Sequence, residues 1–239
     1  MVGLSNLDYN TIRLESNSDK EIIQSNPTIL HKILQKLPFS WLGIVKKQIN
    51  MNCKTILDVG CGYGFPMQTI NTKKRFETVG IDIFMPYIRI CKEKKIHNNY
   101  ILCDVKYLPF KDKTFDTIIC LEVIEHLPKS EGFNLIRDIE NIARNQVILS
   151  TPVGICHQNE GDNNEYMEHK SSWELIEFNK MNYKTIGWGL KYLFGNRTPP
   201  TGISWMLVVS TVAIYILGII PYFFTHLASH MVCSKNIKK

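Results

Sequence analysis

The chain has 239 residues, of which 44% are hydrophobic and 21% are charged, and this composition is typical of a folded protein with a substantial core. The net charge of +6 is not gathered into a basic stripe with interleaved aromatic residues, which argues against nucleic acid as a partner. The seven cysteines form no CxxC pair, which favours a reduced compartment and argues against a zinc site.

The predicted elements begin with a helix over 27–37, in which Ile29, Ile33 and Leu37 recur at helical spacing. After it, apolar segments typical of buried strands alternate with segments typical of helices. Strands are predicted over 54–60, 76–83, 100–104, 115–123, 146–151 and, from a weaker pattern, 183–189. Helices are predicted from the glycine turn to residue 72, over 85–95, over 130–143 with Ser130 as the N-cap, and over 169–183. This alternation predicts an α/β fold with parallel strands and helices on both faces of the sheet, and no seventh strand is evident after Gly189.

The stretch ILDVGCGYG (56–64) places three glycines directly after an apolar strand that ends at Asp58. Glycine lets the backbone turn tightly and lets a ligand approach without meeting a Cβ. Asp82 ends the next strand, about twenty residues later, where an acid can bind ribose hydroxyls. The loop therefore predicts a ligand that contains a nucleoside.

The loop spacing also indicates which nucleoside is bound. G-x-G-x-G differs from the G-x-G-x-x-G of dinucleotide sites, where a helix N-terminus meets a pyrophosphate. The carboxylate of Asp58 would repel a pyrophosphate but attract an ammonium group. S-adenosylmethionine has both a ribose and a cationic amino-acid end, so it is the ligand that the residues favour.

Four segments carry a resemblance to a known family: ILDVGCGYG, VGID, LCDVKYLPFKDKTFDTIICLEVIEHL and VILSTP. Together they resemble the class I S-adenosylmethionine-dependent methyltransferases of the small-molecule type, over residues 50–155. The resemblance implies a Rossmann-like doubly wound sheet and S-adenosyl-L-methionine as the cofactor. The residues that it implies for binding are Asp58, Gly60, Cys61, Gly62 and Gly64 at the methionine end, Asp82 at the ribose, Ile83, Asp104 and Val105 at the adenine, and Leu121 near the methyl donor.

The string LEVIEHL (121–127) follows the fourth strand, where an acceptor would meet the methyl group. His126 is the candidate catalytic base, and Glu125 either orients it or contacts the substrate; alternatively, both only shape a turn. Together with Glu122, these two residues also resemble the metal-binding pattern of quinone-biosynthesis O-methyltransferases, although the favoured prediction has no metal ligand. The segment after the fifth strand is expected to cover the acceptor, with His157, Tyr166, His169 and Trp173 as candidate contacts.

Residues 198–234 contain no Asp, Glu, Lys or Arg, and aromatic residues lie near both ends of the uncharged run 203–224. A membrane-spanning helix needs about 20 such residues with aromatic residues at its ends. The sequence therefore predicts a C-terminal hydrophobic membrane-associated helix, with a buried helix or terminal strands as the competing interpretation. The predicted domains are an N-terminal helical segment (1–50), a methyltransferase domain (51–197) and a transmembrane C-terminal segment (198–239).

The predicted function is methyl transfer from S-adenosylmethionine to a small-molecule, lipid-linked or glycan acceptor at the membrane, with the catalytic domain on the cytoplasmic side. Two other classes stay open: a non-catalytic adenosylmethionine-binding membrane protein, and a nicotinamide-dependent enzyme on a related sheet. The intact loop with Asp82 and Asp104 argues against the first class. Asp58 and the loop spacing argue against the second class.

Overall fold

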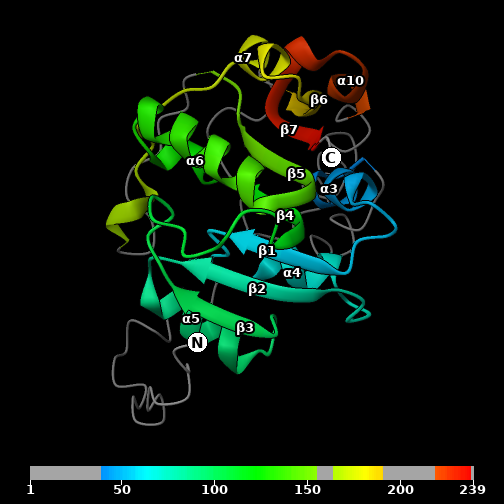
Figure 1. Ribbon diagram of the computed structural model, residues 1–239. Coiled ribbons are helices and arrows are strands. Elements are labelled where there is room, and N and C mark those ends of the chain that lie inside the picture. The colour runs from blue at the N-terminus through cyan, green and yellow to red at the C-terminus, as the bar shows by residue number, and fades with distance from the viewer. Residues whose placement is uncertain (1–38, 155–163, 191–218, 238–239) are drawn as a thin grey trace, which may run out of the picture.

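The computed structural model describes residues 39–154, 164–190 and 219–237, and within them a seven-stranded sheet forms the centre of the molecule (Figure 1). Its strand order is β3-β2-β1-β4-β5-β7-β6. β1 to β5 pair in parallel, whereas β7 is antiparallel to both β5 and β6. The strands are β1 (Thr55–Val59), β2 (Glu77–Asp82), β3 (Asn99–Leu102), β4 (Phe115–Leu121), β5 (Ala143–Pro152), β6 (Lys184–Leu190) and β7 (Ala228–Asn236).

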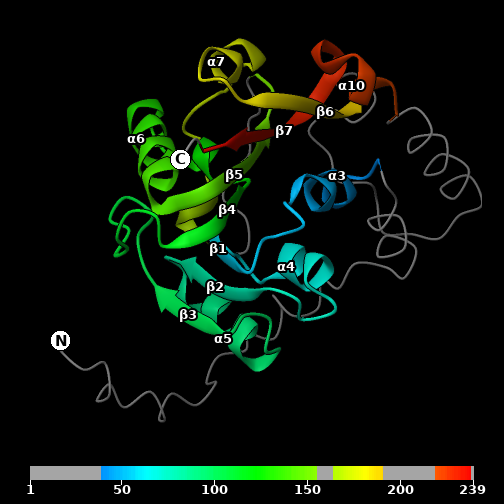
Figure 2. The ribbon, with the colours of Figure 1, turned by 45° about the vertical axis from the view of Figure 1, so that its right-hand side comes forward.

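Helices cover both faces of the sheet (Figures 1 and 2). The helices α3, α4 and α5 lie on one face, and α6 lies on the other with α7 near its end. Their bounds are α3 (Trp41–Gln48), α4 (Phe65–Ile70), α5 (Met85–Glu93), α6 (Lys129–Ile142), α7 (Leu175–Lys180) and α10 (Ile219–Phe223). The short 3-10 helices are η1 (Ile124–His126), η2 (Glu165–Met167) and η3 (Thr225–Leu227).

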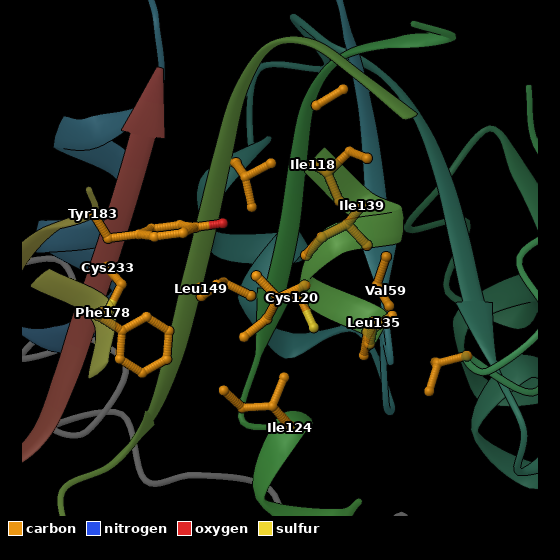
Figure 3. Close-up of a cluster of buried hydrophobic side chains, with 14 of the residues drawn as sticks. Val59, Ile118, Cys120, Ile124, Leu135, Ile139, Leu149, Phe178, Tyr183 and Cys233 are labelled. Carbon is orange, nitrogen blue, oxygen red and sulfur yellow. The ribbon is translucent and has the colours of Figure 1, made fainter. Parts of the chain in front are cut away.

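The continuous apolar runs of the central strands supply two cores at once, because successive side chains of a strand point to opposite faces. Ile118 and Leu149 join the cluster beneath α6, which Figure 3 shows in close-up. Their neighbours Ile119 and Ile148 join the cluster beneath α3, α4 and α5. Burial on both faces explains why the middle of each of these strands is a continuous apolar run.

The strand order creates a switch point between β1 and β4. The chain adds β2 and then β3 on one side of β1, and it returns to place β4 on the other side. In such sheets the ligand crevice lies beyond the carboxyl ends of the strands at the point where the order reverses. The glycine loop follows β1 directly, so the structure places it at this point.

The six predicted strands occur close to their expected positions, but two helices differ from the prediction. The helix α6 begins at Lys129, directly after the extended Pro128, so Ser130 lies in its first turn and is not the N-cap. The helix expected over 169–183 is confined to α7. The helix expected over 27–37 lies outside the described residues.

The prediction of a C-terminal membrane-associated helix is wrong, and so is the membrane localisation that was based on it. Across residues 39–154, 164–190 and 219–237, no helix is both long enough and apolar enough to cross a bilayer. Residues 203–218 of the uncharged run lie outside the described residues. Its last part forms the five-residue helix α10, whose Pro221 carbonyl oxygen would lie 2.4 Å from a Cβ at Gly187 of β6. This part of the run therefore packs against the sheet.

The chain then forms β7, the seventh strand that the sequence did not reveal. It fills the place between β5 and β6, and Met231, Val232 and Cys233 are completely or almost completely buried there. Residues 228–236, which the sequence assigned to a separate segment, thus belong to the same sheet as β1 to β6. The other domain boundaries, at residues 50 and 197, stay predictions.

Candidate active site

The loop after β1 depends on glycine for its shape. Gly60, Gly62 and Gly64 have φ angles of 66°, 53° and 79°, in the left-handed region that side chains disfavour. A Cβ at Gly60 would also lie 2.4 Å from Cγ2 of Val123, whereas a Cβ at Gly62 would meet no described atom within 4 Å. The loop is therefore packed on the side of β4 and open around Gly62.

Asp82, at the end of β2, is held against this loop. Its Oδ2 accepts a hydrogen bond from the Gly62 backbone N–H at 2.8 Å, and its Oδ1 accepts one from the Phe84 N–H at 2.8 Å. Burial raises the pKa of this carboxyl group, and the backbone donors act in the opposite direction. Since each carboxylate oxygen can accept more than one hydrogen bond, the anchored group can still bind a pair of hydroxyl groups.

Asp58 differs from Asp82 in having few partners. Only 2% of the residue is exposed, and among the described residues its buried Oδ2 has no hydrogen-bond partner. Burial, with a further contribution from the Asp82 charge, raises the pKa of Asp58 to about 8. An acid buried in this way at the base of an open loop fits a cationic ligand group, because that group would compensate the carboxylate.

The remaining predicted cofactor residues follow the carboxyl ends of the neighbouring strands. Asp104 comes after β3, and its Oδ1 accepts a hydrogen bond from the Lys106 N–H at 2.9 Å. Ile83 is partly buried. Cys61, Val105 and Leu121 are 3%, 9% and 7% exposed. The structure thus brings the predicted residues to one edge of the sheet, and their role in cofactor binding stays a prediction.

His126 lies in η1, directly after β4. Its Nδ1 is 3.2 Å from the carbonyl oxygen of Glu168, which can only accept, so Nδ1 carries the proton and Nε2 keeps a lone pair. Burial lowers the pKa of this imidazole to about 4, so the ring is neutral at pH 7. The ring of His169 lies at 4.9 Å between centroids, in an edge-on arrangement.

Glu125 is tied into the fold around His126. Only 2% of it is exposed, and its Oε2 accepts a hydrogen bond from the Thr151 hydroxyl at 3.1 Å. Its backbone carbonyl accepts from the N–H groups of Lys170 and Ser171. Burial, followed by the nearby Glu122, raises the pKa of the Glu125 carboxyl well above its usual range. Burial thus favours the protonated form of this carboxyl group, and the Glu125 backbone connects η1 to the segment that follows the fifth strand.

Ser150 and His230 lie at this edge and were not predicted as site residues, and Glu122 was considered only as an alternative metal ligand. Glu122 has a left-handed φ of 55°, and its Oε1 accepts a hydrogen bond from the Ser150 hydroxyl at 2.7 Å. Its Oε2 lies 3.7 Å from Nε2 of His230. His230 belongs to β7, so no analysis that missed this strand could place it here. Ser150 lies in the segment VILSTP, but the sequence gave no sign that its hydroxyl would bond to the Glu122 carboxylate.

The residues that the sequence predicted as acceptor contacts do not all lie at the candidate site. Trp173 is completely buried, and its ring lies 3.6 Å from Nζ of Lys129, so it belongs to the core near α6. Tyr166 lies in η2 and is 39% exposed. His157 lies outside the described residues.

A family model described as a methyltransferase domain matches residues 57–149, which contain most of β1, all of β2 to β4 and most of β5. This chain carries a methyltransferase domain. The resemblance of residues 50–155 to class I S-adenosylmethionine-dependent methyltransferases is thereby confirmed, and so is the predicted cofactor. The fold of the methyltransferase domain agrees with the crystal structure of an S-adenosylmethionine-dependent methyltransferase from Archaeoglobus fulgidus, with a TM-score of 0.53 and 15% identity. That alignment covers 85% of this chain and 98% of the other.

Curated relatives match this chain over part of their own length. The tRNA U34 carboxymethyltransferase of Nautilia profundicola is 36% identical over 93 residues, which cover 36% of this chain and 30% of the relative. The ubiquinone biosynthesis O-methyltransferase of Coxiella burnetii is 29% identical over 127 residues, which cover 48% of this chain and 54% of the relative. The chain thus spans between about a third and about half of these relatives.

The side chains around the loop fit S-adenosylmethionine. A Cβ at Gly62 would meet no described atom within 4 Å, Asp58 is an almost completely buried acid, and Asp82 is anchored beside the same loop. A ligand with a ribose and an ammonium group would meet complementary chemistry at both acids.

Proposed function

We propose that this protein transfers a methyl group from S-adenosylmethionine to an oxygen or nitrogen atom of a small-molecule acceptor. The observation that carries the proposal is the open glycine loop between Asp58 and Asp82 at the switch point of the sheet, within the matched methyltransferase domain. The loop spacing and Asp58 separate the proposal from the nicotinamide-dependent alternative, because an acid at the base of the loop offers no positive charge to a pyrophosphate and repels it once ionised.

The cofactor residues act by binding and orienting. When bound, S-adenosylmethionine supplies a methyl group on a sulfonium, which needs no activation by the protein. Asp58 would face the ammonium group, and Asp82 would accept hydrogen bonds from the ribose hydroxyls. Ile83 and Val105 would flank the adenine, with Asp104 at its amino group. Leu121 helps to keep water from the methyl carbon, so most of the rate comes from alignment and from the exclusion of water.

His126 is the acceptor-side residue in this proposal. Its Nδ1 donates to the Glu168 carbonyl, so the lone pair on Nε2 can accept a hydrogen bond from the hydroxyl or amine of an acceptor. A group with a pKa near 4 is a weak base at pH 7, and we therefore assign to His126 the orientation of the acceptor and partial proton transfer. Glu125, whose carboxyl group accepts a hydrogen bond from Thr151, keeps η1 in place.

One observation favours a second candidate, a metal-assisted O-methylation. The potential ligand atoms of Glu125, His126 and His169 all lie within 4.8 Å of one another. This set contains His169 in place of the Glu122 that the sequence pattern suggested. Two imidazoles and a carboxylate suit a transition-metal ion, but the raised pKa of Glu125 opposes cation binding because its proton must first leave.

Both candidates can be tested in one assay with the full-length protein. Radiolabelled S-adenosylmethionine would be incubated with a small-molecule extract, and the labelled products would be separated by chromatography. Transfer of label supports the proposed function, whereas binding without transfer in any fraction would favour a non-catalytic protein. Loss of transfer on treatment with EDTA and its return with added Mn²⁺ or Zn²⁺ would favour the metal-assisted candidate.

The acceptor-side role predicts a specific effect of His126→Ala. We expect the turnover number to fall by about 10²-fold, the lower end of the range for a group that takes part in proton transfer. The affinity for S-adenosylmethionine should stay within twofold, because His126 lies on the acceptor side. His226→Ala, at an exposed histidine in η3, is the matched control. A loss below threefold would show that His126 only shapes the turn.

A further inference from the structure

A second histidine, His97, lies beneath the glycine loop and has no role in the site as described so far. It belongs to the connection between α5 and β3, and its side chain is completely buried. Its Nε2 lies 3.4 Å from Oδ2 of Asp58. Within the described part of the chain, neither ring nitrogen has a hydrogen-bond partner.

The fold makes a specific place for this ring. Gly80 of β2 is the direct neighbour of Asp58 across the β1–β2 pair, and a Cβ there would lie 2.6 Å from Cδ2 and 2.8 Å from Nε2 of His97. The absence of a side chain at Gly80 therefore lets the imidazole reach the acid. Tyr100 supports the ring from another side, with the two ring centroids 5.7 Å apart.

The backbone of His97 is fixed by the same tyrosine. The His97 N–H donates to the Tyr100 hydroxyl at 2.9 Å, and this hydroxyl donates to the Cys91 carbonyl at the same distance. The connection is thus bonded to the last part of α5 and to β3. Because the His97 backbone is fixed, its imidazole can in turn restrict the position of the Asp58 carboxyl group.

Electrostatics favour a neutral imidazole next to the acid. Burial lowers the pKa of His97 to about 4, and the Lys74 ammonium group acts in the same direction. A neutral ring with its proton on Nε2 can donate to one carboxylate oxygen without bringing a positive charge to the place where a cationic ligand must bind. It would leave the other oxygen, Oδ1, for that ligand.

We propose that His97 is a positioning residue for the amino-acid end of the cofactor, which holds Asp58 through Oδ2 so that Oδ1 faces the ligand ammonium. The inference rests on the proposed function in one respect, namely that the ligand is S-adenosylmethionine. It assigns to Gly80 the complementary role of making room for the imidazole.

The test compares ligands with and without the ammonium group. Isothermal titration calorimetry on the full-length protein would use S-adenosylmethionine, S-adenosylhomocysteine and 5′-methylthioadenosine, which lacks the amino-acid end. For His97→Leu we expect about tenfold or more weaker binding of the first two ligands, because the variant lacks the donor that can meet Oδ2 of the ionised Asp58. The affinity for 5′-methylthioadenosine should change less than twofold. His226→Leu is the control.

Further variants distinguish positioning from a general loss of structure. His97→Gln, which retains a donor, should recover part of the affinity, and in an Asp58→Asn background His97→Leu should cost little more. Gly80→Ala, which pushes the ring away, should show the same ligand discrimination. If His97→Leu does not fold, His97→Gln and Gly80→Ala provide the comparison.

Equal losses for all three ligands, or no loss for any, would overturn the proposal for His97. Failure of the wild-type protein to bind all three ligands would instead overturn the proposed function. The two failures are therefore distinguishable in one set of titrations.

Discussion

Two buried acids define the candidate cofactor site, and they differ in their hydrogen-bond partners. Asp82 accepts hydrogen bonds from the backbone of Gly62 and Phe84, so its position is set before any ligand binds. Asp58 has His97 near one oxygen and a pKa raised to about 8. The sequence predicted both acids from their spacing around the glycine loop. It gave no signal for His97, which is a single histidine in a polar connection.

The raised pKa of Asp58 predicts that cofactor binding releases a proton. In the free protein the carboxyl group is mostly protonated below pH 8, whereas the ligand ammonium favours the carboxylate. The affinity for S-adenosylmethionine should therefore increase as the pH rises from 6 to 8, by at most about tenfold per pH unit, and then level off. Calorimetry in buffers of different ionisation enthalpy measures the released proton directly.

Asp58→Asn is the control for this prediction, because an amide cannot release a proton in this range. The release should disappear in the variant. An affinity for the wild-type protein that does not change between pH 6 and 8 would show that Asp58 is already ionised in the free protein.

Substitutions at two glycines of the loop should affect stability and ligand affinity differently. Gly60→Ala combines a left-handed φ with a Cβ 2.4 Å from Val123, whereas Gly62→Ala has only the φ cost, about 1–2 kcal/mol. Gly60→Ala should therefore lower the free energy of unfolding more. Gly62→Ala should instead have the smaller loss of stability but the clearer loss of ligand affinity, because its Cβ enters the open side of the loop. Chemical denaturation and calorimetry on both variants test this, and equal stability losses would contradict it.

At the scale of elements, the main difference between sequence and structure is β7. The six strands predicted from apolar runs are present, because each run is bounded by glycines or polar turns that mark its ends. Residues 203–224 form one long uncharged run with only Gly218 and Pro221 as breaks near its end. Its hydropathy shows that the segment is apolar, but not whether lipid or protein covers it. The following residues 228–236 contain serine and histidine, so they did not read as a central strand.

Because β7 pairs with β5 on one side and β6 on the other, we expect the stability of the sheet to depend on it. Val232 is 1% exposed and pairs with Ser150 on one side and Ile186 on the other. Val232→Asp would bury a charge in the sheet and should lower the free energy of unfolding by more than about 3 kcal/mol. Asn236→Asp, at the exposed end of the same strand, should change it by less than about 0.5 kcal/mol. Similar melting temperatures for the two variants would contradict the burial of β7.

At the scale of the whole molecule, the switch point of the sheet determines where the candidate site lies. The cofactor residues were predictable because the class I pattern follows the carboxyl ends of consecutive strands. The acceptor side was less predictable, since it combines η1, the segment after β5 and His230 from β7, which are far apart in the sequence. Trp173 illustrates the limit, because a tryptophan in a polar segment gave no sign that it would pack into the core near α6.

The central claim is that the loop between Asp58 and Asp82 binds S-adenosylmethionine, and calorimetric titration of the full-length protein tests it most directly. We expect the wild-type protein to bind the cofactor and Asp82→Ala to bind it about 1–3 kcal/mol more weakly, since the ribose hydroxyls lose their acceptor. Asp112→Ala, at an exposed loop before β4, should bind like the wild-type protein. No binding by the wild-type protein, or an unchanged affinity in Asp82→Ala, would contradict the account.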